Sequence, residues 1–190
     1  MANKNKKTTG LRYVICISGA AETGHCELGA VEKAQEIGRE ITKQGFILVT
    51  GATTGMPYWA AKGAKEAGGT VIGFSPAASK ISHQRTYHLP IDYHDVIVYT
   101  GFGYSGRNLL LTRASDAVIF ICGRMGTLNE FTIAYEDLKP IGVLKGTGGT
   151  ADMVEDLIDK SHRGPGKIAY DSDPAKLLDK VVELIKREEV

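Results

Sequence analysis

Apolar runs and segments of helical spacing alternate along nearly the whole chain. Continuous apolar runs predict strands at residues 13–18, 46–50, 70–74, 96–99, 117–122, 141–144 and 168–170. Apolar residues at three- and four-residue spacing predict helices at 27–44, 57–67, 107–115, from 127 onward, 151–161 and 174–187. Nearly every strand is therefore followed by a helix, and a long polar connection at 76–94 interrupts the series.

This alternation predicts a doubly wound α/β fold. Strands that are apolar throughout are typical of parallel sheets that helices cover on both faces, with right-handed crossovers between the strands. We expect one Rossmann-like domain over residues 12–190, with a mainly parallel sheet of six to seven strands, and a disordered basic tail at 1–11. Ligands of such sheets bind beyond the carboxyl ends of the strands, where the strand order reverses.

The net charge and the apolar runs of the chain argue against nucleic acid and membranes as partners. The chain has 190 residues, of which 43% are hydrophobic, and a formal net charge of +1, which gives no general attraction to nucleic acid or to an anionic membrane. No apolar run is long enough to span a bilayer, and the N-terminus lacks the apolar core of a signal peptide. We therefore expect a cytoplasmic protein with no nucleic-acid or membrane partner.

The cysteines and histidines do not indicate a metal site. The three cysteines form no CxxC pair, and Cys16 and Cys122 fall in apolar strand runs, where a reduced cysteine behaves as a small hydrophobe. We therefore expect neither a disulfide framework nor a zinc site, as in a reducing compartment. The connection at 76–94 is expected to be an irregular functional loop. Its histidines, at a spacing that matches no compact metal site, are expected to be solvated: His83, His88 and His94.

The turn after the second strand is the first candidate ligand site. Gly51 and Gly55 let the backbone approach a phosphate or a sugar, and the next helix points its N-terminus toward the same place. A tight turn without a ligand is an equally good interpretation, because the spacing is not the GxGxxG of dinucleotide-binding proteins. Trp59, in that helix, fits helix packing better than a role in covering an adenine.

The second candidate is Arg107, which begins a helix after another carboxyl-end loop. An arginine in this position can fork a phosphate or a carboxylate. On this pattern alone, a solvated surface arginine is the simpler interpretation.

The third candidate is the turn at 123–126, which joins the fifth strand to a helix expected to begin at Thr127. Unpaired N–H groups and the helix dipole favour a phosphate there. Thr127 and Glu130 also fit a capping box, in which each side chain satisfies the other's backbone N–H. Glu130 is therefore either a capping residue or a carboxylate directed at a ligand.

Together these motifs resemble the LOG (Lonely Guy) family of the SLOG superfamily, which was long labelled as lysine decarboxylases. The turn at 51–56, the segment 67–76, Arg107 and the stretch 122–130 match the family pattern in the right order. The resemblance extends over about residues 12 to 160. The sequence has no recognisable lysine motif for pyridoxal phosphate, so we expect neither a decarboxylase nor a cofactor.

The resemblance implies a nucleotide-binding dimer. Family members with activity are phosphoribohydrolases, which cleave the N-glycosidic bond of a nucleoside 5′-monophosphate. On this resemblance Arg107 and Glu130 are the catalytic pair, and the carboxylate stabilises oxocarbenium charge while it orients water. The phosphate and the rest of the nucleotide are expected on Gly19, Gly51, Thr53, Thr54, Gly55, Met56, Gly123, Arg124, Met125, Gly126 and Thr127.

Three positions depart from the family pattern. Cys122 and Arg124 replace the proline and the second glycine of its Pro-Gly-Gly turn, and Asn108 replaces the lysine after the arginine. Arg124 either adds a fork for phosphate or fills the space that glycine leaves open. The Arg-Asn form looks more like a sister branch that includes molybdenum-cofactor carriers. The alternative function is therefore non-catalytic binding or carriage of a phosphorylated ligand, a nucleotide or a molybdopterin cofactor.

Overall fold

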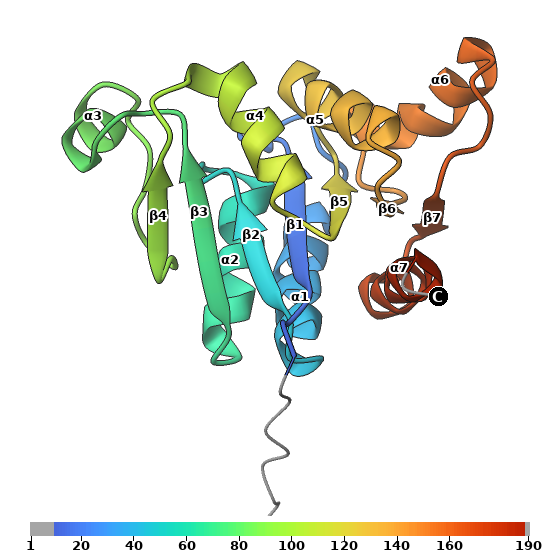
Figure 1. The fold of residues 1–190 in the computed structure, drawn as a ribbon, viewed down its shortest axis with the longest axis horizontal. Helices are drawn as coiled ribbons and strands as arrows, with labels where there is room; N and C mark the ends of the chain where they lie inside the picture. Colours follow the sequence, from blue (N-terminus) through green and yellow to red (C-terminus); the bar gives the residue numbers. More distant parts are fainter. Residues whose placement is uncertain (1–9, 189–190) are drawn as a thin grey trace, which may run out of the picture.

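The computed structural model describes residues 10–188, so the predicted tail at 1–11 lies almost wholly outside the described residues. The strands are β1 Val14–Gly19, β2 Ile47–Thr50, β3 Thr70–Ser75, β4 Val96–Tyr99, β5 Ala117–Ile121, β6 Ile141–Leu144 and β7 Ile168–Asp171 (Figure 1). The helices are α1 Ala30–Lys43, α2 Met56–Glu66, α3 Lys80–Arg85, α4 Gly103–Arg113, α5 Met125–Glu136, the 3-10 helix η1 Gly149–Met153, α6 Val154–Ser161 and α7 Pro174–Glu188. Among the described residues, no helix combines the length and the apolar character that crossing a membrane requires.

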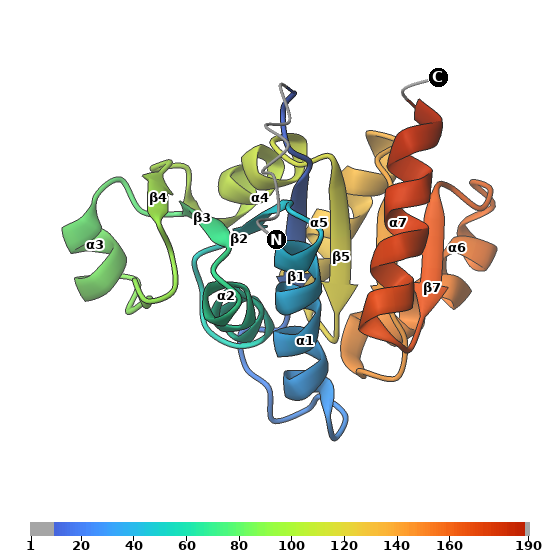
Figure 2. The ribbon, with the colours of Figure 1, turned by 90° about the horizontal axis from the view of Figure 1, so that it is seen from below.

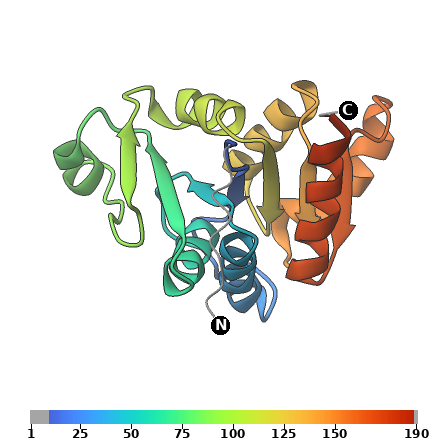
Figure 3. The ribbon, with the colours of Figure 1, turned by 60° about the horizontal axis from the view of Figure 1, so that its bottom comes forward.

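The strands form one parallel sheet in the order β4-β3-β2-β1-β5-β6-β7, which confirms the predicted Rossmann-like α/β fold. The order reverses between β1 and β5. Helices α1, α2 and α7 cover one face of the sheet, and α4 and α5 cover the other (Figures 2 and 3). The prediction that strands are covered on both faces fails at the edge strand β4, where Val96 and Val98 are exposed.

Alternate side chains of the central strands supply two cores. Ile15 and Ile17 of β1 pack with residues of α1, α2 and α7, whereas Cys16 packs with residues of α4 and α5. On β5, Ile119 belongs to the first core and Phe120 to the second. Because both faces of these strands are buried, the strands appear in the sequence as unbroken apolar runs.

The connection at 76–94, predicted to be irregular, contains the short helix α3, and two of its histidines are not solvated. A ring nitrogen of His83, which is fully buried, lies 2.8 Å from Oγ of Ser75. Nε2 of His94 lies 2.8 Å from Oγ1 of Thr50, and burial lowers the pKa of this imidazole. Hydroxyl groups at the ends of β2 and β3 pair with these ring nitrogens, so the two rings can be buried without losing their hydrogen bonds. The third histidine of the connection is exposed, as predicted.

Cys26 and Cys122 form a disulfide, which contradicts the predicted absence of disulfides. The prediction placed Cys122 inside a strand, but β5 ends at Ile121 and Cys122 has a φ of 54°, so the chain leaves the sheet at this residue. Its sulfur then meets the loop between β1 and α1, with the two Cα atoms 5.8 Å apart. Cys16 is buried and free, as predicted, and burial raises the pKa of its thiol.

Candidate functional site

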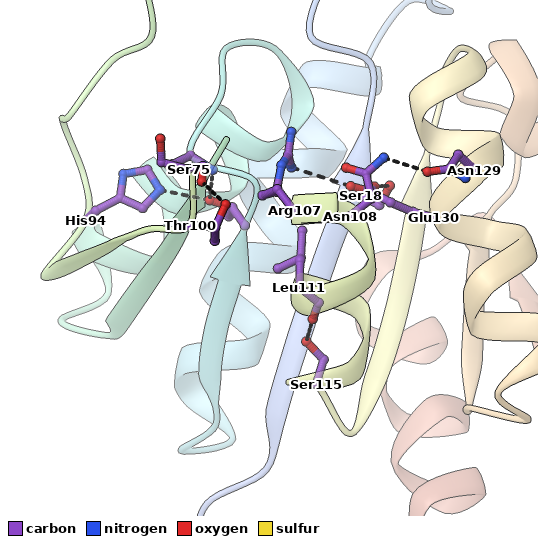
Figure 4. Close-up of polar contacts among 12 residues, drawn as sticks. Ser18, Ser75, His94, Thr100, Arg107, Asn108, Leu111, Ser115, Asn129 and Glu130 are labelled. Atoms are coloured by element: carbon purple, nitrogen blue, oxygen red, sulfur yellow. Dashed lines mark hydrogen bonds and ion pairs between the residues drawn. The ribbon is translucent and has the colours of Figure 1, made fainter. Parts of the chain in front are cut away.

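A cavity lies at the carboxyl ends of β1 and β5, where the strand order reverses. Fold geometry favours ligand binding at this position in doubly wound sheets. The end of β1, the turn after β2 and the first turns of α4 and α5 converge there (Figure 4). The cavity is lined by Ile17, Ser18, Gly19, Ala20, Ala21, Gly51, Thr53, Pro57, Tyr104, Arg107, Asn108, Arg124, Gly126, Thr127 and Glu130.

The cavity brings together most of the predicted site residues, which come from the end of β1 and from the three motifs. Those that line it are Gly19, Gly51, Thr53, Arg107, Arg124, Gly126, Thr127 and Glu130. Those that do not are Thr54, Gly55, Met56, Gly123 and Met125. Trp59 is also absent from the lining and packs against the core, with Nζ of Lys62 4.9 Å from its ring centre.

In the turn after β2, polar groups that were expected to bind a ligand instead bond to the chain after β1. Oγ1 of Thr54 donates to the carbonyl of Ala21 at 2.9 Å, and the N–H of Met56 donates to the carbonyl of Ala20 at 2.9 Å. Gly55 has a φ of 73°, and a Cβ there would overlap the Ala20 carbonyl oxygen. This glycine turn therefore positions the chain after β1, and its own amides are partly used within the protein.

Arg107 is held inside the cavity wall by the absence of a side chain on Gly51. A Cβ on Gly51 would overlap the Arg107 guanidinium at Nη1. Only 7% of the arginine side chain is exposed, so the guanidinium is buried. The simpler interpretation of the sequence, a solvated surface arginine, is therefore wrong. Its Nε has no hydrogen-bond partner within residues 10–188. A buried, unsatisfied donor on a cation is costly, and because Arg107 lines the cavity, an anionic ligand there would offset its positive charge.

Glu130 points into the cavity and does not cap its helix. Its carboxylate accepts a short hydrogen bond from Oγ of Ser18, and its Oε1 lies 3.5 Å from Nη1 of Arg107 (Figure 4). Burial raises the pKa of Glu130, and the charge of Arg107 and the bond from Ser18 offset this only in part. The capping-box interpretation is therefore wrong, because the carboxylate is directed at other elements of the cavity.

Asn108 completes the surroundings of Glu130. Its side-chain amide lies 2.9 Å from Oδ1 of Asn129. With the amide turned by 180°, its nitrogen donates to Glu130 Oε1 at 2.9 Å and to the carbonyl of Tyr104 at 3.0 Å. Asn108, one of the three positions at which this chain departs from the family pattern, is thus buried next to the carboxylate.

The N-terminus of α5 opens toward the cavity. The helix begins at Met125, two residues before the predicted start at Thr127, and no side chain caps it. Gly126 and Thr127 of its first turn line the cavity. The first N–H groups of a helix have no partner within the helix and carry partial positive charge, so this end suits an anion.

Arg124 lies at the rim and does not fill the cavity. It precedes α5, its side chain is half exposed, and its Nη1 pairs with Oε2 of Glu22 at 3.0 Å. The pair joins the turn before α5 to the loop after β1 across the cavity wall. Exposed pairs contribute little to stability, typically about 0–1 kcal/mol, so Arg124 can exchange Glu22 for a ligand.

Sequence reasoning missed several lining residues. Ser18 appeared as the last residue of a strand, and nothing near it in sequence signals its bond to Glu130. Ala20 and Ala21 carry no chemistry of their own and line the cavity through their placement. Tyr104, whose ring centre lies 5.7 Å from the Arg107 guanidinium carbon, lies in the first turn of α4. This residue was expected in a loop, because the start of the helix was predicted four residues too late.

The chain and its fold have known relatives. A family model described as the SLOG cluster4 family matches residues 12–178. An uncharacterised protein from Archaeoglobus fulgidus is 30% identical over 127 residues, which cover 67% of this chain and 78% of that protein. The predicted resemblance to the LOG and SLOG proteins is thereby confirmed.

Two solved structures of related sequence cover almost the whole domain. The molybdenum cofactor carrier protein MCP from Chlamydomonas reinhardtii is 28% identical, with a TM-score of 0.73 and coverage of 92% of this chain and 99% of that chain. The molybdenum cofactor binding protein from Rippkaea orientalis is 27% identical, with a TM-score of 0.71 and coverage of 95% and 99%. The chain is thus similar to cofactor-binding proteins over its full fold.

Proposed function

Because this chain belongs to the SLOG cluster4 family, we propose that its cavity binds a phosphorylated small molecule, either a nucleotide or a molybdopterin cofactor. The observation that carries the proposal is Arg107, a buried cation whose Nε has no partner among residues 10–188. The uncapped start of α5 lines the same cavity. A phosphate in the cavity would accept hydrogen bonds from the start of α5 and be attracted by the positive charge of Arg107.

Carriage without turnover is our first choice between the two functions. The similar proteins from Chlamydomonas reinhardtii and Rippkaea orientalis are described as a molybdenum cofactor carrier and a molybdenum cofactor binding protein. Glu130 already accepts a bond from Ser18 and lies beside Arg107, so its lone pairs are partly used before any ligand arrives. We infer that Glu130 holds Arg107 in position for the ligand.

Hydrolysis of a nucleoside 5′-monophosphate is the second candidate, and the Arg107–Glu130 pair favours it. In that reaction water adds to C1′ of the ribose, the N-glycosidic bond breaks, and the base leaves with a proton. Glu130 would orient the water and stabilise the positive charge that develops on the ribose, while Arg107 would hold the phosphate.

We further propose that the protein acts in the cytoplasm as a homodimer. Large apolar side chains are exposed on the edge strand β4, just before α4 and on α4: Val96, Val98, Phe102 and Leu110. Such a surface is typical of a protein interface. Sedimentation velocity tests the dimer independently of the ligand.

Two measurements test whether the protein binds such a ligand. Calorimetric titration with AMP, GMP and inorganic phosphate tests binding, and pterin fluorescence of protein purified from a cofactor-producing host tests for a bound molybdopterin. We expect at least one of these ligands at one per chain. If none of them binds, the proposal is wrong.

Release of ribose 5-phosphate from AMP or GMP tests hydrolysis. The matched variants are Glu130→Gln and Glu136→Gln, on the same helix, because Glu136 is exposed and pairs with Arg163 outside the cavity. Turnover that is lost only in Glu130→Gln would favour the enzyme. Binding without release in the wild type favours the carrier.

A further inference from the structure

The disulfide between Cys26 and Cys122 lies beside the cavity, and its surroundings favour thiol–disulfide exchange. It joins the loop after β1 to the turn before α5, across 96 positions of sequence. Cys122 has no exposed surface, whereas Cys26 is only partly buried. An attacking thiolate therefore reaches the bond at Cys26, and Cys122 is the sulfur that leaves.

His25 is placed to assist that departure. Its Nε2 lies 3.5 Å from Sγ of Cys122 and 3.4 Å from the carbonyl of Gly123. The imidazole is exposed to solvent. An imidazolium next to a leaving thiolate stabilises its charge and can donate a proton to it.

The turn at Cys122 does not depend on the disulfide for its shape. The N–H of Cys122 donates to Oγ1 of Thr147 at 2.8 Å, and its carbonyl accepts from the N–H of Ala151 at 2.8 Å. The N–H of Thr150 donates to the Gly123 carbonyl at 3.1 Å. The loop before α6 thus holds this turn from the other side, and the bond can open without unfolding it.

We propose that His25, Cys26 and Cys122 form a redox-active thiol site that exchanges with dithiol reductants. A thiolate of the reductant attacks Sγ of Cys26, the bond between the two sulfurs breaks, and Cys122 leaves with the electron pair and takes a proton from His25 or solvent. The second thiol of the reductant then displaces Cys26. The protein gains two thiols, and the dithiol is oxidised to a disulfide.

The state of this site acts on the segment that directly follows two residues of the cavity wall, Ala20 and Ala21. Ala20 and Ala21 stay tied to the turn after β2, but the segment at 22–29 has fewer bonds. Without the disulfide, this segment keeps the exposed pair of Glu22 with Arg124, the contact of His25 Nε2 with the Gly123 carbonyl, and the bond from the N–H of Glu27 to the Thr147 carbonyl. Reduction therefore loosens the segment next to Arg124, and a bound ligand leaves faster. This second consequence rests on the proposed function.

Exchange is tested on the folded full chain in buffers of reduced and oxidised dithiothreitol. Thiols are trapped with an alkylating agent and counted by mass, while circular dichroism follows the fold. We expect reversible conversion between a form with Cys16 as its free cysteine and a form with all three cysteines reduced, with the fold kept throughout. A bond that opens only on unfolding, or that does not re-form, would overturn the proposal.

The role of His25 has its own readout. In His25→Asn, reduction by dithiothreitol should slow at least threefold, whereas His162→Asn, at another exposed histidine, should match the wild type. Equal reduction rates in the two variants would show that His25 takes no part in the exchange. One Zn²⁺ held by the reduced protein in a way that blocks re-oxidation would instead assign the three residues to a metal site and overturn the redox assignment.

Ligand release is measured separately, with AMP as the probe. We expect AMP to dissociate at least threefold faster from the reduced protein and from Cys26→Ser than from the oxidised protein. If AMP does not bind, and none of the other ligands in the binding tests binds either, while the thiols exchange, the proposed function fails and the redox site stands. If AMP binds with equal rates in both states, the effect of reduction on ligand release is refuted and the proposed function stands.

Discussion

Gly51 and Arg107 fit together so closely that a Cβ on Gly51 would overlap Nη1 of the arginine. Gly51→Ala should therefore displace the guanidinium from the cavity wall and weaken binding of AMP by about 10-fold or more, the effect of losing one or two charge-assisted hydrogen bonds. Calorimetry measures the affinity, and circular dichroism checks that the variant is folded. Unchanged affinity in a folded variant would show that the arginine does not contact the ligand.

Glu130 gives a prediction for the dependence of stability on pH. Burial raises its pKa, so the folded protein keeps the proton at pH values where the unfolded chain has released it. The contribution of this group to the free energy of unfolding is therefore greatest below the ordinary glutamate pKa and falls as pH rises through the raised value.

Urea unfolding over a pH series tests this prediction. In Glu130→Gln this part of the pH dependence should disappear, and in Glu136→Gln it should remain. The absolute stability of Glu130→Gln should also fall, because the substitution leaves Arg107 buried without its charged partner. The same pH slope in both variants would mean that Glu130 is ionised in the folded protein as freely as in the unfolded chain.

Helices α1 and α2 pack through glycines on both sides. A Cβ on Gly38 would overlap the carbonyl oxygen of Ala60, and a Cβ on Gly63 would overlap that of Gln35. Gly38→Ala should lower the free energy of unfolding by about 1–3 kcal/mol, as overpacking does. Gly126→Ala is the matched control, because no atom lies within 4 Å of its added methyl. Equal stability of the two variants would contradict the close packing.

The disulfide should stabilise the oxidised protein substantially, because it closes a loop across 96 positions. Removing such a bond typically costs about 2–5 kcal/mol. Urea unfolding of oxidised wild type and of Cys26→Ser should differ by this amount, and reduced wild type should match the variant. No difference between the oxidised and reduced wild type would show that the cysteines are not bonded in solution.

The fold was predictable because its strands are buried on both faces and its helices are punctuated by glycine. Unbroken apolar runs fixed the central strands, and Gly45, with a φ of 82°, ends α1 as expected. The close contact of α1 with α2 was not foreseen, because small residues in a helix do not reveal which neighbour they meet. The edge strand was misjudged since Val96 and Val98 look the same in sequence whether buried or exposed.

The site was predictable as a set of turns but not in its side-chain directions. Thr127 and Glu130 fit a capping box equally well in sequence, and only the start of α5 at Met125 places Glu130 beyond the reach of a cap. Cys122 was predicted to be a strand residue because it continues an apolar run. β5 ends before it because Cys122 has a positive φ, and a cysteine in the sequence does not indicate such a conformation. Hydrogen bonds between residues far apart in sequence, such as that of Ser18 with Glu130, could not be predicted, because only the folded chain brings the two residues together.

The central claim is that Arg107 binds the phosphate of the ligand. Calorimetric titration of AMP into Arg107→Ala tests it most directly, with Arg113→Ala as the control, since Arg113 lies on the same helix and pairs with Asp137 at the surface. We predict that binding weakens about 10- to 100-fold in Arg107→Ala and stays unchanged in Arg113→Ala. Equal affinity of the two variants for AMP, in folded protein whose wild type binds it, would contradict the claim.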